Sequence, residues 1–446
     1  MRGSRALLNN AALRRAWARP TRCLARPTRC FATKEDPGAT KGSGAKQDDS
    51  PPWRDGRVAA VCGSTLTMMT GHGVATPCIP LLATALCASA ADVGAALSTF
   101  GLARLALNVP VGLAADSIGR KPLLVGDALV NAAGHAASAL APDVTSFAAA
   151  RFVAGAGQAA YLGTAQVYLS DVAKPSQRGR VLGLNHAALL LGVSVGPVLG
   201  GFGAELSVRA PFYAVSGLGL LAAAHAFCSL EETKPATSPR KDEQKEAGRL
   251  RDVLADVPFA SAAFAHGTTF AVRQGGRNLP LALTASSTFG YSPFQLGQLF
   301  GAMALADLAG VAPASWLSDK IADKRYVVCG SILGSAAGLL AVSWVAMAAE
   351  ASGDPDQLAF LGAVSLWALS TAALGPTLPA YAAELVPEAK RGLGLAAFRS
   401  EGDVGFVGAP LALGLCADAF GAPAALAGLA GASVASAGAF AVLNRR

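Results

Sequence analysis

Long apolar runs separated by short polar turns are the feature that most limits how this chain can fold. A helix that crosses the hydrocarbon core of a bilayer needs about 20 mostly apolar residues. Such runs occur twelve times, near residues 57–80, 93–115, 122–141, 145–169, 180–203, 209–229, 256–285, 294–317, 326–348, 357–383, 391–416 and 421–443. The chain is only 15% charged, with a mean hydropathy of +0.41, whereas soluble domains carry about 25% charged residues. The sequence therefore predicts an all-α membrane protein with twelve transmembrane helices.

The basic residues indicate how these helices are oriented. Lys and Arg are in excess on the inner loops of membrane proteins. Here they fall on the even-numbered loops and at the C-terminus, while the odd-numbered loops carry mainly Asp and Glu. The basic set consists of Arg120, Lys121, Lys174, Arg178, Arg180, Lys320, Lys324, Arg325, Lys390, Arg391, Arg445 and Arg446. Both ends of the chain are therefore expected on the same, inner face.

The first six runs and the last six are copies of one another. One constant shift in numbering, called the longer shift below, aligns Asp171 with Glu384, Gly192 with Gly405, Pro197 with Pro410 and Gly201 with Gly414. A second constant shift, the shorter shift, aligns Asp116 with Asp319 and Lys121 with Lys324. Extra residues around Asp354 account for the difference between the two shifts. We expect two pseudo-symmetric six-helix bundles, residues 57–230 and 256–446, joined by a central hydrophilic loop at 231–255.

Three motifs fall on this framework. The turn after the second run reads G-x-x-x-D-x-x-G-R-K, with Gly112, Asp116, Gly119, Arg120 and Lys121 as its fixed positions. Arg151 opens an R-x-x-x-G-x-G pattern on the fourth run. The fifth run reads G-x-x-x-G-P-x-x-G-G, with Gly192, Gly196, Pro197, Gly200 and Gly201. Glycines four apart clear one face of a helix, and the proline bends it, so this last stretch is at least a close packing seam.

Together these motifs resemble those of the major facilitator superfamily, and the resemblance runs from Arg57 to the end of the chain. The fifth-run motif resembles the signature of the superfamily's twelve-helix proton antiporters. The resemblance implies alternating access, with substrate bound at mid-membrane between the two bundles. It also implies a gate at the inner face, built from the 112–121 turn and a degenerate second copy at Asp319 and Lys324. Ser117 and Ala114 depart from the usual first copy.

Ionisable residues inside apolar runs are the candidates for a substrate or proton pathway. Arg273 and Arg277, four residues apart, share a face of the seventh run, and Asp307 lies at similar depth in the eighth. We expect Arg273 and Asp307 to pair, because pairing lowers the cost of burying both charges. The pair either pins two helices together or lets Asp307 exchange a proton as it opens.

The resemblance adds candidates on other helices. Arg151, Gln158 and Tyr161 on the fourth run and Gln274 on the seventh would face the central cavity. His72, on the first run, is either a proton or substrate ligand, since imidazole takes up protons near neutral pH, or a histidine bonded to a carbonyl. The superfamily's drug exporters often carry an acid one turn earlier, where this chain has Met68.

Two further polar groups are expected to be structural or gating elements. Asp127, Asn131 and His135 form a stripe on the third run, which in the superfamily packs outside the cavity. Arg399, Glu401 and Asp403, near the inner end of the eleventh run, are expected to form a gate network.

Residues 1–31 have the composition of an organelle transit peptide. They are rich in Arg and lack Asp and Glu, and they contain no apolar core long enough for a secretory signal. The alternative is a basic tail on a plasma-membrane protein. Residues 32–56, rich in Gly, Ser, Asp and Pro, are a disordered spacer. We expect an organelle inner membrane, a mitochondrion before a plastid.

The function predicted from these features is secondary active transport of a small organic solute. The eight cysteines are scattered without ligand spacing, so no metal or cofactor is expected. The chain shows neither clustered His or acids nor a nucleotide-binding loop that would indicate an enzyme. Much of its positive charge lies in the first thirty residues and on one set of loops, so it does not indicate nucleic-acid binding. Proton-coupled antiport by a monomer in the lipid bilayer is the expected mode. The alternatives are an uncoupled facilitator or uniporter and an organic-anion exchanger, since three cavity arginines favour an anionic substrate.

Overall fold

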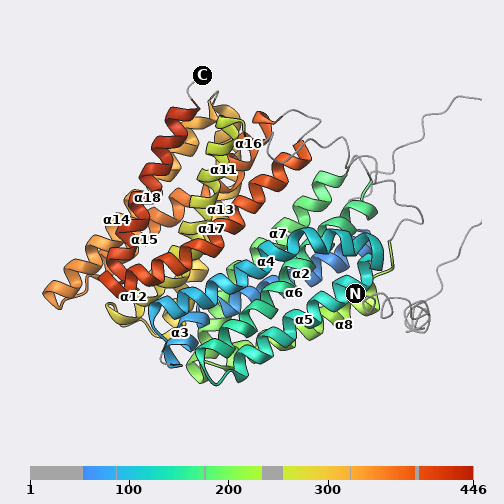
Figure 1. Cartoon of the computed structure of the whole chain (residues 1–446), viewed down its shortest axis with the longest axis horizontal. Coiled ribbons are helices and arrows are strands. Elements are labelled where there is room, and N and C mark those ends of the chain that lie inside the picture. The colour runs from blue at the N-terminus through green and yellow to red at the C-terminus, as the bar shows by residue number, and fades with distance from the viewer. Residues whose placement is uncertain are drawn as a thin grey trace, which may run out of the picture.

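The computed structural model describes residues 54–86, 88–174, 177–233, 255–321, 323–386 and 391–444. Within these ranges every regular element is a helix (Figure 1). The predicted transit peptide, nearly all of the spacer and most of the central loop lie outside the described residues, so the expectations placed on them stay predictions.

The first bundle, called the N-bundle below, contains six helical spans. They are α2 (Gly56–Ala75) with its continuation α3 (Cys78–Ala85), α4 (Ala90–Ile118), α5 (Arg120–Leu140), α6 (Val144–Val172), α7 (Arg178–Leu206) and α8 (Ala210–Ser229). Pro77 lies in the break between α2 and α3, since proline cannot donate the hydrogen bond that would continue the helix. Gly119 joins α4 to α5 with φ 111°, a conformation that favours glycine.

The second bundle, the C-bundle, repeats this plan. Its spans are α11 (Val257–Phe270) continued by η2 (Ala271–Leu281) and α12 (Ala282–Ser287), α13 (Pro293–Lys320), α14 (Lys324–Ser352), α15 (Gln357–Ala372) with α16 (Leu374–Leu385), α17 (Arg391–Phe420) and α18 (Ala422–Leu443). The predicted all-α fold of two six-helix bundles is therefore confirmed. The sequence did not predict that η2 would be a π-helix, wound more widely than the α-helices on either side.

By length and hydropathy alone, nine helices in the described part of the chain can each cross a membrane. The spans outside this set are α2, α6 and the run from α11 to α12. These three carry His72, Arg151 and Arg273. Ionisable groups inside the membrane occur on other spans as well, since Asp307 lies on α13.

The two bundles meet along two equivalent seams, α4 against α17 and α7 against α13. A Cβ atom at Gly94 would lie 2.2 Å from the carbonyl oxygen of Pro410, and one at Gly297 would lie 2.4 Å from that of Pro197. The shorter shift carries Gly94 onto Gly297, and the longer shift carries Pro197 onto Pro410, so the two contacts are copies. The seams are therefore related by the internal pseudo-symmetry, and at these contacts only glycine lets the backbones come so close.

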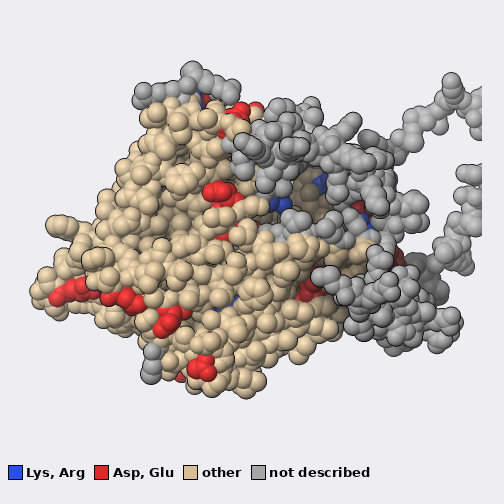
Figure 2. Space-filling model, in the orientation of Figure 1, with Lys and Arg blue, Asp and Glu red and all other residues tan. Residues whose placement is uncertain are grey.

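The molecule is closed at one end and open at the other. Figure 1 shows the bundles touching near α3 and α12 and diverging toward the end where α7 begins and α16 lies. The close glycine contacts fall in the outer halves of α4 and α17. Figure 2 shows the surface hollowed between the bundles, with basic side chains in the hollow, and acidic side chains at the opposite end. In the orientation that the loop charges predict, the conformation is closed outward and open inward.

Candidate functional site

The C-bundle places two arginines on one carboxylate. Arg273 Nη2 lies 2.9 Å from Asp307 Oδ1, and Arg277 Nη2 lies 3.1 Å from Asp307 Oδ2. The predicted Arg273–Asp307 pair is confirmed, whereas the second bond from Arg277 was not predicted. The three side chains are 25%, 11% and 13% exposed, in the order Arg273, Arg277 and Asp307. This group, the C-bundle triad, is thus partly open to solvent and carries one surplus positive charge.

The π-helix positions the triad. Arg273 and Arg277 both lie on η2 and reach α13, where Asp307 is located. Arg273 Nη2 also donates to the carbonyl oxygen of Thr371 on α15. Gln274, expected on the cavity wall, is half-buried and accepts a bond from Asn278 Nδ2 at 3.0 Å. Because π-helical turns are frequent at functional sites, the stretch marks this span as a candidate site.

The N-bundle buries an arginine, Arg151, in a different setting. Arg151 is 1% exposed, and its Nε and Nη1 atoms have no hydrogen-bond partner among the described residues. Its guanidinium carbon lies 4.5 Å from the centre of the Phe100 ring, and the His72 ring lies 5.7 Å from the same ring. These three residues form the N-bundle cluster, in which an aromatic face stabilises the cation.

The structure corrects the expectation that Arg151, Gln158 and Tyr161 face the cavity. All three are buried inside the N-bundle. Gln158 Nε2 lies 3.7 Å from the sulfur of Met69 on α2, and Tyr161 belongs to the apolar core. The reason is close helix packing: a Cβ atom at Gly157 would lie 2.3 Å from the backbone nitrogen of Asn131. In this conformation α6 is therefore drawn into the bundle.

An ion pair between the bundles joins the two halves of the site. Arg104 Nη2 on α4 lies 3.2 Å from Asp403 Oδ1 on α17, and the Arg104 guanidinium lies 5.7 Å from the centre of the Phe406 ring. Arg399 Nη1 donates to Gln166 Oε1 across the same divide. The sequence reasoning missed Arg104, although an arginine inside an apolar run was the signal that would have found it.

The gate residues Arg120, Lys121 and Lys324 contact nearby carboxylates. Arg120 Nε lies 2.9 Å from Asp171 Oδ2, and the backbone nitrogens of Arg120 and Lys121 donate to Glu232. In the C-bundle, Lys324 pairs with Glu384, the counterpart of Asp171. The side chains of Asp116 and Asp319, and Gly112 beside them, are outside the described part. The contacts between bundles predicted for this gate therefore stay a prediction.

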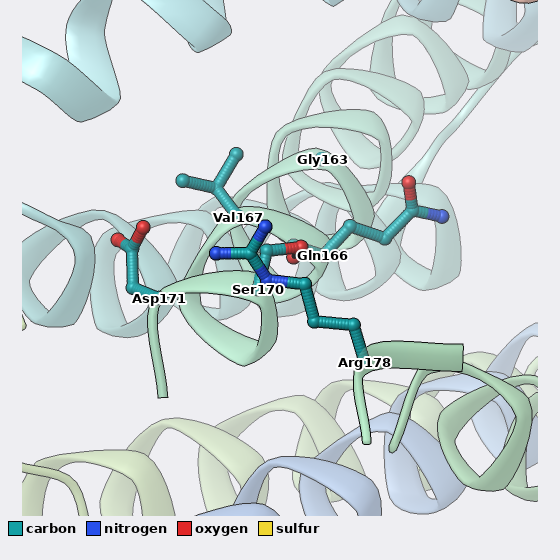
Figure 3. A pocket seen from close by; sticks show the side chains of 6 residues that line it. All are labelled: Gly163, Gln166, Val167, Ser170, Asp171 and Arg178. Carbon is teal, nitrogen blue, oxygen red and sulfur yellow. Dashed lines mark hydrogen bonds between the residues drawn. The ribbon is translucent and has the colours of Figure 1, made fainter. Parts of the chain in front are cut away.

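A cavity of about 330 Å³ lies at the inner end of α6. It is lined by Gly163, Gln166, Val167, Ser170, Asp171 and Arg178. Figure 3 shows the Arg178 guanidinium between the side chains of Asp171 and Gln166. No group of three or more His, Cys, Asp or Glu among the described residues is placed to hold a metal ion.

The glycines of the fifth span form the packing seam that their spacing predicts. Cβ atoms at Gly192, Gly196 and Gly200 would lie 2.7, 2.5 and 2.1 Å from backbone atoms of α2. Gly201 instead faces α13 of the other bundle, 2.5 Å from the Pro293 oxygen. The motif thus holds α7 against both its own bundle and the C-bundle.

Two pseudo-symmetric six-helix bundles that enclose ionic groups at mid-membrane and open to one side define a solute transporter. The sequence model of the Major Facilitator Superfamily matches residues 61–276 and 268–446. The chain belongs to that family. It is an integral, multi-pass membrane protein of a family of transporters.

Known proteins support this assignment. An uncharacterized MFS-type transporter of Methanocaldococcus jannaschii is 29% identical over 170 residues, which are 38% of this chain and 44% of that protein. Multidrug resistance protein 2 of Bacillus subtilis is 23% identical over 269 residues, 59% of this chain and 67% of that protein. The matched part thus spans less than half of the archaeal relative. The inward-facing structure of a bacterial homolog of the human lysosomal transporter Spinster superposes with TM-score 0.70 at 16% identity, covering 88% and 96% of the two chains.

Proposed function

We propose that the protein is a proton-coupled antiporter of a small organic solute that works by alternating access. The observation that carries the proposal is Asp307, a carboxylate bonded to both Arg273 and Arg277 and still 13% exposed. A carboxylate in this position can be neutralised by a proton or can contact a bound solute. The proton and the solute therefore compete for the Asp307 carboxylate. Competition at one site is what couples two fluxes in opposite directions.

The packing of the two bundles supports the same proposal. The seams between the bundles consist of helix faces with glycine contacts, along which one bundle can rock against the other. Pro197 and Gly201 of the α7 motif lie in one of these seams, and the drug-resistance relative comes from the same family. Asp116, Arg120, Lys121, Asp319 and Lys324 are proposed to form the inner gate once the inner side closes.

The test is transport by purified protein in proteoliposomes. A thermal-shift screen against cationic, neutral and anionic metabolites and dyes first selects a solute that binds. An imposed pH gradient is then expected to drive that solute against its own gradient, in the direction opposite to the protons. Asp307→Asn is expected to abolish this uphill movement and to keep solute exchange at equal pH. Uphill movement that survives in Asp307→Asn would contradict the role of Asp307.

A second candidate, an organic-anion exchanger, is favoured by the surplus of positive charge. Arg151 makes no ion pair within the described residues, and the C-bundle triad has two cations for one anion. In an exchanger, a second anion on the far side would drive uptake without any pH gradient. Downhill flux that responds neither to pH nor to a counter-anion would instead identify a uniporter.

We also propose that the protein lies in an organelle membrane. The acid-free, Arg-rich residues 1–31 favour import into an organelle, the mitochondrion first. Residues 1–53 fused to a fluorescent protein are expected to direct it to that organelle. A fusion with Arg14, Arg15 and Arg19 replaced by Gln is expected to stay in the cytosol. Signal at the plasma membrane from the full-length protein would support the alternative.

A further inference from the structure

The two bundles are tied together at their outer end by two carboxylates. Asp418, near the end of α17, accepts hydrogen bonds from the backbone nitrogens of Ala90 (2.8 Å) and Ala91 (2.9 Å), the first residues of α4. Glu205, at the end of α7, accepts one from the backbone nitrogen of Phe294 at the start of α13 (3.0 Å). Each bond joins a helix of one bundle to a helix of the other.

These two contacts are copies of each other. The longer shift carries Glu205 onto Asp418, and the shorter shift carries Ala91 onto Phe294, as for the rest of the two bundles. Both receiving helices also begin alike. Ser89 and Asp92 form a capping box at the start of α4, and Ser292 and Gln295 form one at the start of α13. The contacts therefore belong to the duplicated architecture.

The capping boxes explain which backbone groups are left for the opposite bundle. The serine of each box bonds the nitrogen of the third helical residue, so the first two N–H groups have no partner in their own helix. In α4 these are the N–H groups of Ala90 and Ala91, and Asp418 takes both. In α13 the first residue is Pro293, which has no N–H, so Glu205 takes only the bond from Phe294.

We propose that Glu205 and Asp418 form an outer latch that holds the outer side closed while the inner side is open. The proposal rests on alternating access, not on the identity of the solute or of the coupling ion. A carboxylate at a helix N-terminus gains from the hydrogen bonds and from the helix dipole. Opening the outer side must pull α4 away from α17 and α7 away from α13, so both carboxylates lose these partners in the outward-facing state. The latch thus stabilises one state of the cycle, and Asp418, with two bonds, is its stronger half.

The test measures how far apart the bundles stand at each end. Spin labels at Thr145→Cys and Ser352→Cys report the outer distance, and labels at Arg180→Cys and Tyr326→Cys report the inner one; all four sites are exposed or lie at helix ends. Exposed Cys228 is replaced by Ser in every sample.

In the full-length protein in nanodiscs, the Glu205→Ala/Asp418→Ala double variant is expected to raise the outward-facing fraction roughly fivefold or more. In this variant, the outer label-to-label distance is expected to lengthen and the inner one to shorten.

The single variants rank the two halves. Asp418→Ala is expected to shift the equilibrium between the inward-facing and outward-facing states more than Glu205→Ala does. Asp418→Asn is expected to shift it less than Asp418→Ala, because an amide oxygen can still accept one hydrogen bond. The matched control is Asp143→Ala/Asp356→Ala. These outer-face carboxylates cap their own helices within one bundle, at Ser146 and at Leu358 and Ala359.

The controls separate a latch from a general loss of structure. The control pair is expected to leave both distance distributions unchanged while lowering the melting temperature by a similar amount. Unchanged distances in the Glu205→Ala/Asp418→Ala variant, or an equal shift in the control pair, would overturn the latch. A solute found not to be coupled to protons would overturn the proposed antiport and leave this result intact.

Discussion

The two bundles carry their buried arginines in opposite ways. In the N-bundle, Arg151 is enclosed, lies over Phe100 and makes no ion pair among the described residues. In the C-bundle, Arg273 and Arg277 share Asp307 and keep partial access to solvent. The helices around them are related by pseudo-symmetry, but the charges are not. A duplicated framework thus holds two different electrostatic sites, one with a buried arginine over an aromatic ring and one with two arginines on a shared carboxylate.

Removing the shared carboxylate is expected to have the largest effect. Asp307→Asn leaves two arginines facing each other at mid-membrane, which is expected to destabilise the protein by roughly 2–4 kcal/mol given the partial exposure of the group. Thermal unfolding in detergent measures it, with Asp354→Asn in an outer loop as the control. Adding Arg277→Gln to Asp307→Asn is expected to recover stability, since one repulsive charge is removed. No recovery would mean that the triad is not an electrostatic unit.

A pair of matched substitutions tests the contrast directly. Arg277→Gln takes one of two partners from Asp307 and is expected to cost about 1–3 kcal/mol. Arg151→Gln removes a cation that has no counter-ion, so the lost aromatic contact is offset by relief of desolvation, and the change is expected to stay within about 1 kcal/mol. Melting temperatures of the two variants, measured side by side, check this. A larger loss from Arg151→Gln would show that Arg151 has a strong partner in the native protein.

The smallest expected effect isolates the aromatic support of Arg151. Phe100→Leu removes buried ring area, the cation–π contact and the ring contacts with His72 and Phe406. Phe259→Leu, equally buried in the C-bundle, removes buried ring area without a cation–π contact. The difference between the two is expected to be about 0.5–2 kcal/mol. In the Arg151→Gln background this difference should shrink by the part that the cation–π contact supplies. If it stays unchanged, Phe100 acts through packing and not through the arginine.

Much of the architecture could be predicted from residue patterns. Apolar run lengths and loop charges predicted the twelve spans and their orientation, and the two constant shifts in numbering predicted the duplication that the Gly94–Pro410 and Gly297–Pro197 contacts display. The Arg273–Asp307 pair was predicted because two opposite charges at equal depth in neighbouring spans have strong reason to meet. The second bond from Arg277 was not, because the wide turn of η2 has no clear sequence signature.

By itself, the sequence determined which helices exist and which of them carry charge, because hydrophobic length and charge are properties of each segment alone. The tertiary structure decided what each charge faces. It buried Arg151, Gln158 and Tyr161 inside the N-bundle, joined Arg104 to Asp403 across the divide, and placed Asp418 at the start of α4. These outcomes depend on how far glycines let neighbouring helices approach and rotate, which is a property of pairs of segments and not of either one.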